Sequence, residues 1–186
     1  LPIYLATLGE KSLELTGELA DGWLGTSFIP EKSAALLDPI RVGAARAGRR
    51  LEDLDIQVNA HLEVSEDVEG LIDRYRQGMA FVLGAMGSAK TNFYNAAYAR
   101  AGYADVAREV QQLWIGGDKR AAVAAVSDEL VLSAGLIGTE DMVRERIRAF
   151  RDAGVNVLRI APNGRSSKEQ IEHLEQAMDL IRSESE

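Results

Sequence analysis

Apolar residues along the chain fall into short runs and into helical stripes that follow one another. Residues 2–6 and 23–26 are short apolar runs bounded by turn signals, which predict buried strands. Residues 56–64 alternate between apolar and polar side chains, which predicts a third strand, and residues 155–161 predict a fourth. The stretches between these runs carry apolar residues at helical spacing. The predicted order is therefore β-α-β-α-β, then a long helical region, then β-α.

Start and stop signals place the helices. We expect a first helix from residue 10 to residue 20, and a second from about residue 31 to residue 47. Asp38 and Pro39 should interrupt the second helix, because Asp is a good N-cap and proline suits the first helical position. Gly48 can end that helix in a left-handed conformation. Residues 65–138 read as a helical region broken at several glycines, and Thr139 caps the helix that follows.

Strands that alternate with helices predict an α/β fold with right-handed crossovers and a parallel sheet. Four strands suit either a small doubly wound sheet or one half of an eight-stranded (β/α)8 barrel. Half a barrel leaves two sheet edges uncovered, so it needs a partner half. The chain opens directly on a strand and without Met, which suggests a piece cut from a longer protein, although a removed tag gives the same start.

Composition narrows the classes of function. The 186 residues carry 21 basic and 29 acidic side chains, a net charge of −8, which is unlike a nucleic-acid-binding protein. No apolar run reaches the roughly 20 residues of a membrane helix, so no membrane partner is expected. The absence of cysteine excludes disulfides and thiolate metal sites, and it is compatible with the cytoplasm, where we expect the protein.

Two neighbouring strand ends carry groups suited to an anion. In parallel α/β folds, ligands gather at the carboxyl ends of the strands. At the first end, residues 6–11, Gly9 allows close backbone approach and precedes a helix whose free N–H groups attract anions. At the second, Thr26 and Ser27 offer hydroxyl donors. The competing interpretation is that Gly9 is an ordinary turn glycine and Ser27 a helix cap.

Three further polar residues are candidates for the lining of a pocket. His61 and Glu63 lie on the polar side of the third predicted strand, and Arg159 lies on the last. Arg159 could neutralise Glu63 as a structural ion pair, or it could hold an anion of substrate or cofactor. His61 is either a hydrogen-bonded core histidine or a base. No metal site is expected, because the other histidine, His173, lies on the terminal helix.

Several motifs resemble the bacterial luciferase-like superfamily. Residues 2–6, 9–13 and 20–23 resemble its strand five, helix five and strand six, and residues 138–140, 150–155 and 160–162 resemble its closing helix seven and strand eight. Other motifs resemble the branch that uses the deazaflavin coenzyme F420: Met86-Gly87, Asn92-Phe93-Tyr94, Gly102-Tyr103, Trp114, Gly117-Asp118 and residues 128–131.

The resemblance implies a TIM-barrel oxidoreductase that transfers hydride between F420 and a small organic substrate. Residues 1–186 would then be the C-terminal half of one barrel domain, strands five to eight, with residues 65–138 as a helical insertion. In this family the strand-five loop and the end of strand six hold the phosphate tail of the coenzyme. That role would fall on Thr7, Leu8, Gly9, Glu10, Thr26 and Ser27. Relatives usually have proline where this chain has Glu10, so Glu10 is the weakest of these assignments.

The proton-transfer residues of the family lie mainly on strands one to four, so no catalytic acid or base can be assigned here. We expect the isolated chain to be inactive and the full-length protein to be a homo-oligomer. Two alternatives stay open. One is an FMN-dependent monooxygenase of the same superfamily, and the other is a non-catalytic half-barrel subunit that binds or assembles with a partner.

Overall fold

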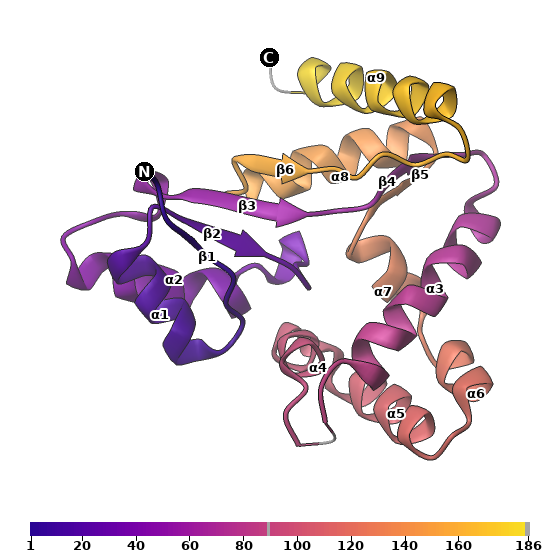
Figure 1. Ribbon diagram of the computed structural model, residues 1–186, viewed down its shortest axis with the longest axis horizontal. Coiled ribbons are helices and arrows are strands. Elements are labelled where there is room, and N and C mark those ends of the chain that lie inside the picture. Colours follow the sequence, from indigo (N-terminus) through magenta and orange to yellow (C-terminus); the bar gives the residue numbers. More distant parts are fainter. Residues whose placement is uncertain (89, 185–186) are drawn as a thin grey trace.

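The computed structural model describes residues 1–88 and 90–184, and it is built around a four-stranded parallel sheet with the strand order β1-β2-β3-β6 (Figure 1). In chain order the elements are β1 (Tyr4–Leu5), α1 (Glu10–Leu19), β2 (Gly22–Gly25), η1 (Pro30–Lys32), α2 (Ala34–Arg46), η2 (Leu51–Asp53), β3 (Asp55–Asn59), β4 (Leu62–Val64), α3 (Val68–Ala85), α4 (Phe93–Tyr98), η3 (Ala99–Tyr103), α5 (Ala104–Ile115), α6 (Lys119–Ala124), α7 (Asp128–Ser133), β5 (Leu136–Gly138), α8 (Glu140–Asp152), β6 (Val157–Arg159) and α9 (Ser167–Ser183).

The two faces of the sheet differ in burial. Trp23 of β2 pairs in register with Ile56 of β3, and both side chains are buried in one core cluster with α1, α2 and α8. On the opposite face, Asn59 of β3 pairs with Arg159 of β6, and both are exposed. Only one face of the sheet is therefore covered by the helices of this chain. β1 and β6 form the two edges of the sheet.

Helices α1 and α2 pack closely because two glycines let their backbones meet. A Cβ at Gly43 would lie 1.7 Å from the carbonyl oxygen of Glu14, and one at Gly17 would lie 2.0 Å from that of Ile40. The predicted break of α2 at Pro39 is wrong, since the helix runs through this proline without interruption. Leucines before Pro39 and Ile40 after it are buried in the core, and their burial offsets the one lost backbone hydrogen bond. Gly48 does end the segment with φ +70°.

The predicted third strand is split. β3 ends at Asn59, and the chain resumes at Leu62 as β4, which pairs with β5 instead of with the main sheet. The prediction of one strand over residues 56–64 is therefore wrong, although the buried positions alternate as expected through Leu62. β5 was missed, and β1 and β6 are shorter than the predicted strands over residues 2–6 and 155–161.

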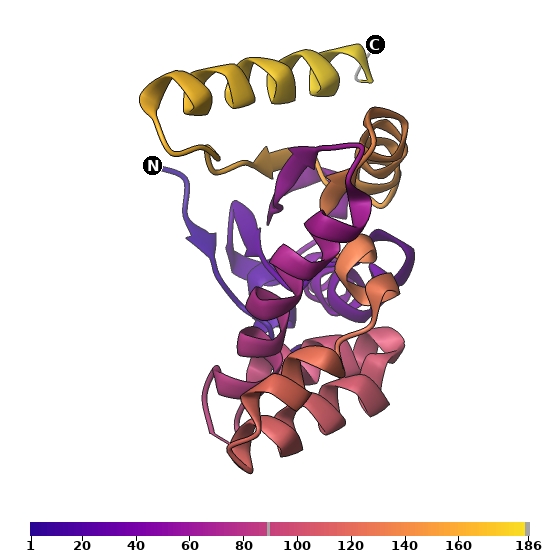
Figure 2. The ribbon, with the colours of Figure 1, turned by 90° about the vertical axis from the view of Figure 1, so that its right-hand side faces the viewer.

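Residues 65–138 form helices α3 to α7 and strand β5, and they supply most members of a second hydrophobic cluster, which also includes Ile29. This second cluster, here called the insertion core, contains Leu71, Leu83, Val110 and Leu130 among its fully or nearly fully buried members. Figure 2 shows these helices at one end of the molecule and α9 at the other, with the strands between them. The division into a barrel part and a helical part, inferred from the sequence, stays a prediction.

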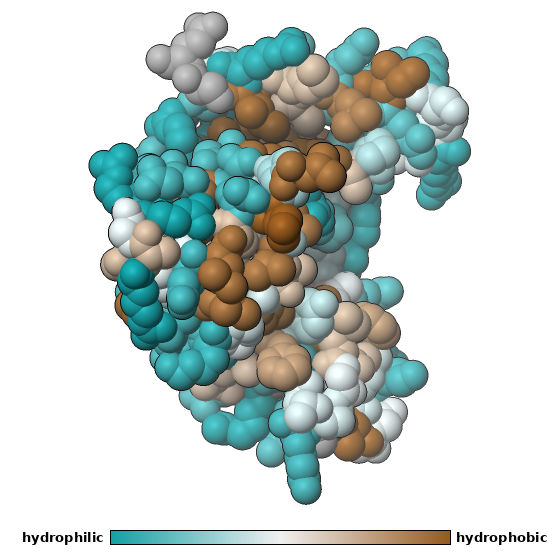
Figure 3. Space-filling model, turned by 60° about the vertical axis from the view of Figure 1, so that its left-hand side comes forward, coloured by the Kyte–Doolittle hydropathy of each residue, from teal (hydrophilic) through white to brown (hydrophobic). Residues whose placement is uncertain are grey.

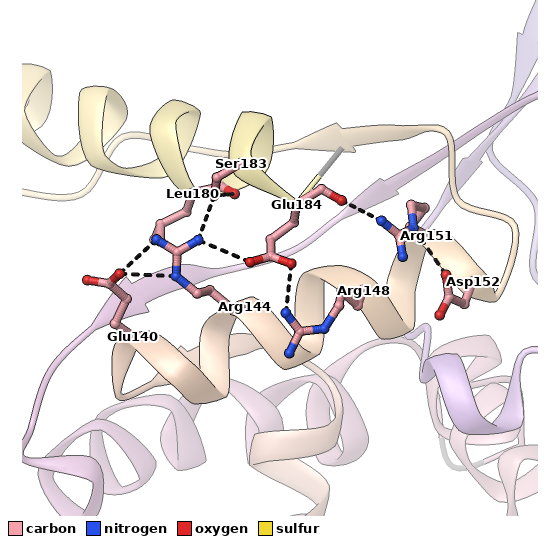
Figure 4. Close-up of polar contacts among 8 residues, drawn as sticks. All are labelled: Glu140, Arg144, Arg148, Arg151, Asp152, Leu180, Ser183 and Glu184. Carbon is pink, nitrogen blue, oxygen red and sulfur yellow. Dashed lines mark hydrogen bonds and ion pairs between the residues drawn. The ribbon is translucent and has the colours of Figure 1, made fainter. Parts of the chain in front are cut away.

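Helix α9 is attached to α8 by an ion-pair network (Figure 4). The carboxylate of Glu184, at the end of α9, accepts from Arg144 at 3.0 Å and from Arg148 at 2.7 Å. Arg144 also donates to Glu140 at 2.8 Å. These cations offset an acidic group at a helix C-terminus, where the macrodipole disfavours it. At the other end of α9, Ser166 provides the N-cap.

Apolar side chains also lie on the surface. Leu1, Ile3, Leu15 and Leu19 are among the exposed large hydrophobic residues. In the space-filling view, apolar side chains gather on the face that carries the N-terminal strand, beside a hollow between α9 and the helical region (Figure 3). Among the helices of residues 1–88 and 90–184, none is long and apolar enough to cross a bilayer.

Candidate functional site

A cavity of about 310 Å³ lies at the carboxyl ends of β2 and β3. Its wall combines the segments that follow these strands with side chains of α3, the end of α4 and the approach to β5. The lining residues are Thr26, Ser27, Phe28, Asn59, His61, Tyr75, Gly78, Met79, Phe81, Val82, Tyr98, Val131, Ala134, Gly135 and Ile137. An apolar, aromatic wall with a few polar groups is typical of a site for a small organic ligand or a cofactor. No Lys, Arg, Asp or Glu is among these residues, so the cavity suits an uncharged, planar group.

Ser27 is the most unusual residue of this wall. Its backbone has φ +53°, which makes it a non-glycine residue in the left-handed region. The residue is 7% exposed, and in the part of the chain that the structure describes its hydroxyl has no hydrogen-bond partner. The buried phenol of Tyr98 is its neighbour, and burial raises the pKa of Tyr98 to about 12 although Ser27 counteracts this slightly. The two hydroxyls lie close enough for Ser27 to act on the pKa of Tyr98, but their geometry falls short of a hydrogen bond, so Ser27 combines backbone strain with a hydroxyl that has no partner among the described residues.

His61 lines the same cavity and packs against the ring of Tyr75 in a tilted arrangement, with 4.9 Å between the ring centroids and 40° between the ring planes. Desolvation lowers the pKa of His61, and the nearby Glu63 raises it by less, so the imidazole is neutral at neutral pH. The Tyr75 hydroxyl donates to Glu63 at 2.8 Å. Burial and this acceptor both raise the pKa of Tyr75. The tyrosine is thus fixed as a neutral donor behind the histidine.

Of the two roles left open for Arg159, the ion pair with Glu63 is not found among the described residues, where Glu63 pairs with Arg74 instead. Glu63 lies on β4, outside the main sheet, and its carboxylate accepts from Arg74, from Tyr75 and from the side-chain amide of Asn163 at 2.8 Å. Arg159 stays on the exposed face of the main sheet. Because the chain leaves the main sheet after β3, Glu63 no longer lies on a strand of the sheet that contains Arg159.

The loop after β1 forms a second group of candidate residues. Thr7 exchanges a hydrogen bond with Thr16 of α1 at 2.8 Å, and its carbonyl accepts from the Trp23 indole at 2.9 Å. Gly9 is the N-cap of α1 and places no side chain over the free N–H groups of the first turn. Glu10 is exposed in that turn. The β1 end therefore offers backbone N–H donors, and the β2 end offers hydroxyls.

A larger cavity, of about 510 Å³, lies elsewhere. Its wall includes Leu51, Val155 and Asn156, which precede β3 or β6, together with Arg151 and Glu184 of the α8–α9 contact. It is therefore at the amino ends of the strands. In parallel α/β folds that end serves stability while chemistry gathers at the carboxyl ends, so the smaller cavity is the better candidate. In the part of the chain that the structure describes, no group of acidic, Cys or His side chains could hold a metal ion.

Sequence reasoning missed several residues at this site. Tyr75, Met79 and Val82 belong to the apolar stripe of α3 and were expected only to pack, yet they also line the cavity. Tyr98 reaches the strand ends from the helical region, and nothing in the local sequence indicates this. His173 was set aside as a metal ligand and has a structural role: its Nε2–H donates to the carbonyl of Leu62 at 2.6 Å.

The chain is similar to known proteins over most of its length. Residues 1–157 match the family profile described as luciferase-like monooxygenase. A protein of Mycobacterium tuberculosis, named provisionally as a coenzyme F420-dependent oxidoreductase, is 32% identical over 176 residues, which are 94% of this chain and 50% of that protein. The 5,10-methylenetetrahydromethanopterin reductase of Archaeoglobus fulgidus is 28% identical over 173 residues, 92% of this chain and 52% of the enzyme.

A solved structure gives the same result for the fold. The coenzyme F420-dependent tetrahydromethanopterin reductase from Methanopyrus kandleri superposes with a TM-score of 0.71 at 25% identity, covering 95% of this chain and 49% of that one. The chain thus spans about half the length of the relatives that it matches. Across the described residues, the likeness extends over both the sheet and the helical region.

Proposed function

This chain belongs to the luciferase-like monooxygenase family, and from that premise we propose that it is the coenzyme-holding half of a barrel oxidoreductase that uses F420. The relatives named for F420 and the carboxyl-end cavity support this proposal. The observation that carries it is the buried, unpartnered Ser27 hydroxyl at the cavity wall. A ligand that accepts from this hydroxyl would explain why it is retained there.

The residues of this chain suit the two chemical parts of such a coenzyme. The cavity presents aromatic and apolar side chains with a neutral His61, which is compatible with an uncharged planar ring. Thr7, Leu8, Gly9 and Glu10 surround the uncovered start of α1, and Thr26 and Ser27 supply hydroxyls, which suits a phosphate. When bound, the deazaflavin ring supplies hydride transfer to or from a small organic substrate. The chain would bind and orient this ring and exclude water from one side of it.

The exposed face and the two open edges of the sheet support the proposal that this chain is half of a barrel. β1 and β6 each present unpaired backbone groups, and Arg159 and Asn59 lie on an uncovered face. We propose that four further βα units close this sheet, and that the closed barrel forms a homo-oligomer in the cytoplasm. Sedimentation of the 186-residue chain should show self-association. A stable folded monomer would contradict the half-barrel proposal.

Titration with coenzyme tests the functional proposal. The protein carrying this chain is titrated with F420 and, separately, with FMN, and the cofactor's absorbance and fluorescence are followed. Binding of F420 with a spectral shift supports the proposal. Tight FMN binding without any response to F420 would instead support an FMN-dependent monooxygenase. No binding of either cofactor, together with self-association, would favour the non-catalytic assembly subunit.

A further inference from the structure

The helical region reaches back to the two strand ends through a short segment, residues 98–100. Arg100 donates from one amino nitrogen to the carbonyl oxygen of Leu8 at 2.6 Å, across 92 positions of sequence. Two residues earlier, the buried ring of Tyr98 lies beside Ser27. One segment therefore contacts the end of β1 and the end of β2 together. In Figure 1 the end of α4 lies below these strand ends, between α1 and α3.

This segment is held firmly by amide side chains. Asn92 is buried and donates to the carbonyl of Leu83 at 2.9 Å, at the end of α3. Asn95 donates to the same carbonyl at 2.9 Å and to that of Ala107 at 2.6 Å. Gly102, with φ +97°, then turns the chain from α4 into α5. Arg100 is thus placed by a packed segment and not by a loose loop.

Among the described residues, no carboxylate neutralises the charge of Arg100. Over residues 1–88 and 90–184, no carboxylate lies within ion-pair distance of its guanidinium, and only the Leu8 carbonyl accepts from it. Most arginines of the neighbouring helices are paired with a carboxylate, as Arg108 is with Asp105 at 2.5 Å. An exposed guanidinium with spare donors, beside an uncovered helix start, is a suitable partner for a phosphate or carboxylate oxygen.

We propose that Arg100 binds the anionic phosphate tail of the coenzyme. Arg100 would thereby favour binding of the complete coenzyme over the same chromophore without its tail. The proposal rests on the proposed function. It has two independent supports: the unpaired guanidinium on the β1 end, and the buried, unpartnered Ser27 hydroxyl at the neighbouring β2 end. The helical region thereby contributes a cation with no carboxylate partner among the described residues, whereas Lys11 at the first strand end pairs with Glu14 at 2.9 Å.

The competing explanation is that Arg100 only fastens the helical region to the β1 loop. The two roles differ in what a substitution changes. An anion-binding role affects ligands that carry the tail and depends on salt concentration, because salt screens the attraction. A fastening role lowers stability and affects every ligand of the cavity to the same extent.

The test uses the protein carrying this chain as wild type, Arg100→Gln and Arg100→Lys, with Arg108→Gln as the matched control. Arg108 is exposed on α5, and its substitution removes the same charge from the same region. Each protein is titrated with F420 and with the deazaflavin chromophore that lacks the phosphate tail, at low and at high salt. Thermal unfolding of each variant is measured alongside.

We expect Arg100→Gln to weaken F420 binding by about tenfold and the salt dependence of F420 binding to decrease. Binding of the tail-less chromophore should change by less than about twofold. Arg100→Lys should recover part of the loss, and Arg108→Gln should resemble wild type. If Arg100→Gln weakens both ligands equally or leaves both unchanged, the inference is overturned while the proposed function stands. If the wild-type protein binds neither ligand, the proposed function itself fails.

Discussion

Replacing Ser27 with alanine should raise stability and lower affinity together. The hydroxyl is buried and unpartnered in the free protein, so it contributes a desolvation cost with no hydrogen bond in return. Such a group costs about 1–3 kcal/mol, and its removal should recover about 1 kcal/mol of unfolding free energy. Alanine keeps the left-handed strain at φ +53°, so the gain belongs to the hydroxyl alone.

The same substitution should weaken coenzyme binding. A hydrogen bond from Ser27 to the ligand contributes about 1 kcal/mol net, which corresponds to about fivefold in Kd. Urea denaturation of the free protein gives the first quantity, and fluorescence titration with F420 gives the second. Ser27→Gly separates the backbone effect: it removes the same hydroxyl and also relieves the strain, so it should be more stable than Ser27→Ala.

Two results would refute this reasoning. A loss of more than about 1 kcal/mol in the free Ser27→Ala protein would show that the hydroxyl is satisfied in solution, with Tyr98 as the nearest candidate partner. An unchanged Kd would show that the hydroxyl does not contact the ligand. An opposite change in the two quantities, stability up and affinity down, is the signature of a hydroxyl that serves the ligand at a cost to stability.

Three further predictions concern packing and pH. Gly43→Ala should destabilise the protein by about 3 kcal/mol in urea denaturation, because the new Cβ would lie 1.7 Å from the carbonyl oxygen of Glu14. Gly78→Ala in α3 places its Cβ in open space, so the same assay should show a neutral or slightly stabilising effect. Arg148 and Arg144 of α8 lower the pKa of Glu184. The contribution of Glu184 to the attachment of α9 is therefore present above its ordinary pKa of 4.5 and is lost as pH falls through the lower folded pKa. Hydrogen exchange of α9 between about pH 6 and pH 3 should show protection decreasing with acidity. Desolvation lowers the pKa of His61, so the contribution of the neutral imidazole to folding stability is present above pH 6.5 and declines as pH falls below that value. An NMR titration of His61 should give a midpoint below 6.5. A midpoint above 6.5 would contradict the desolvated environment of this side chain.

The helices were predictable because their signals are local. Thr139 accepts from the backbone N–H of Met142 as the cap expected from sequence, and Gly48 takes the left-handed conformation expected of a glycine after a helix. Pro39 misled the prediction for a physical reason. A proline penalty of about 3 kcal/mol is also local, but burial on both sides of it in α2 offsets that penalty and depends on the tertiary structure.

The strand break could not be read from the alternation. Ile56, Val58, Ala60 and Leu62 are all buried, so the period-two pattern continues across the point where the chain changes sheet. Burial sets this pattern, and strand pairing is set by partners distant in sequence. The contact of Arg100 could not be predicted from the sequence for the same reason. Its partner is a backbone carbonyl 92 positions away, and such a contact has no sequence motif.

The cavity lies between two hydrophobic cores, so substitutions in one core can change the shape of the cavity while the other core maintains the stability of the sheet. Phe28 belongs to the cluster under the main sheet, whereas Tyr98, Val131 and Ile137 belong to the insertion core, and all four line the cavity. The strands before Gly9 and Ser27 are fixed by pairing within the sheet, although the strand ends themselves also contact Tyr98 and Arg100 of the helical region. Substitutions that keep the insertion core packed should therefore alter the shape of the cavity, and with it the molecule that the cavity accepts, before they alter the stability of the sheet. On this argument, substitutions in the helical region should change which ligand the cavity accepts, whereas substitutions at the strand ends or at Arg100 should change the affinity for the anion.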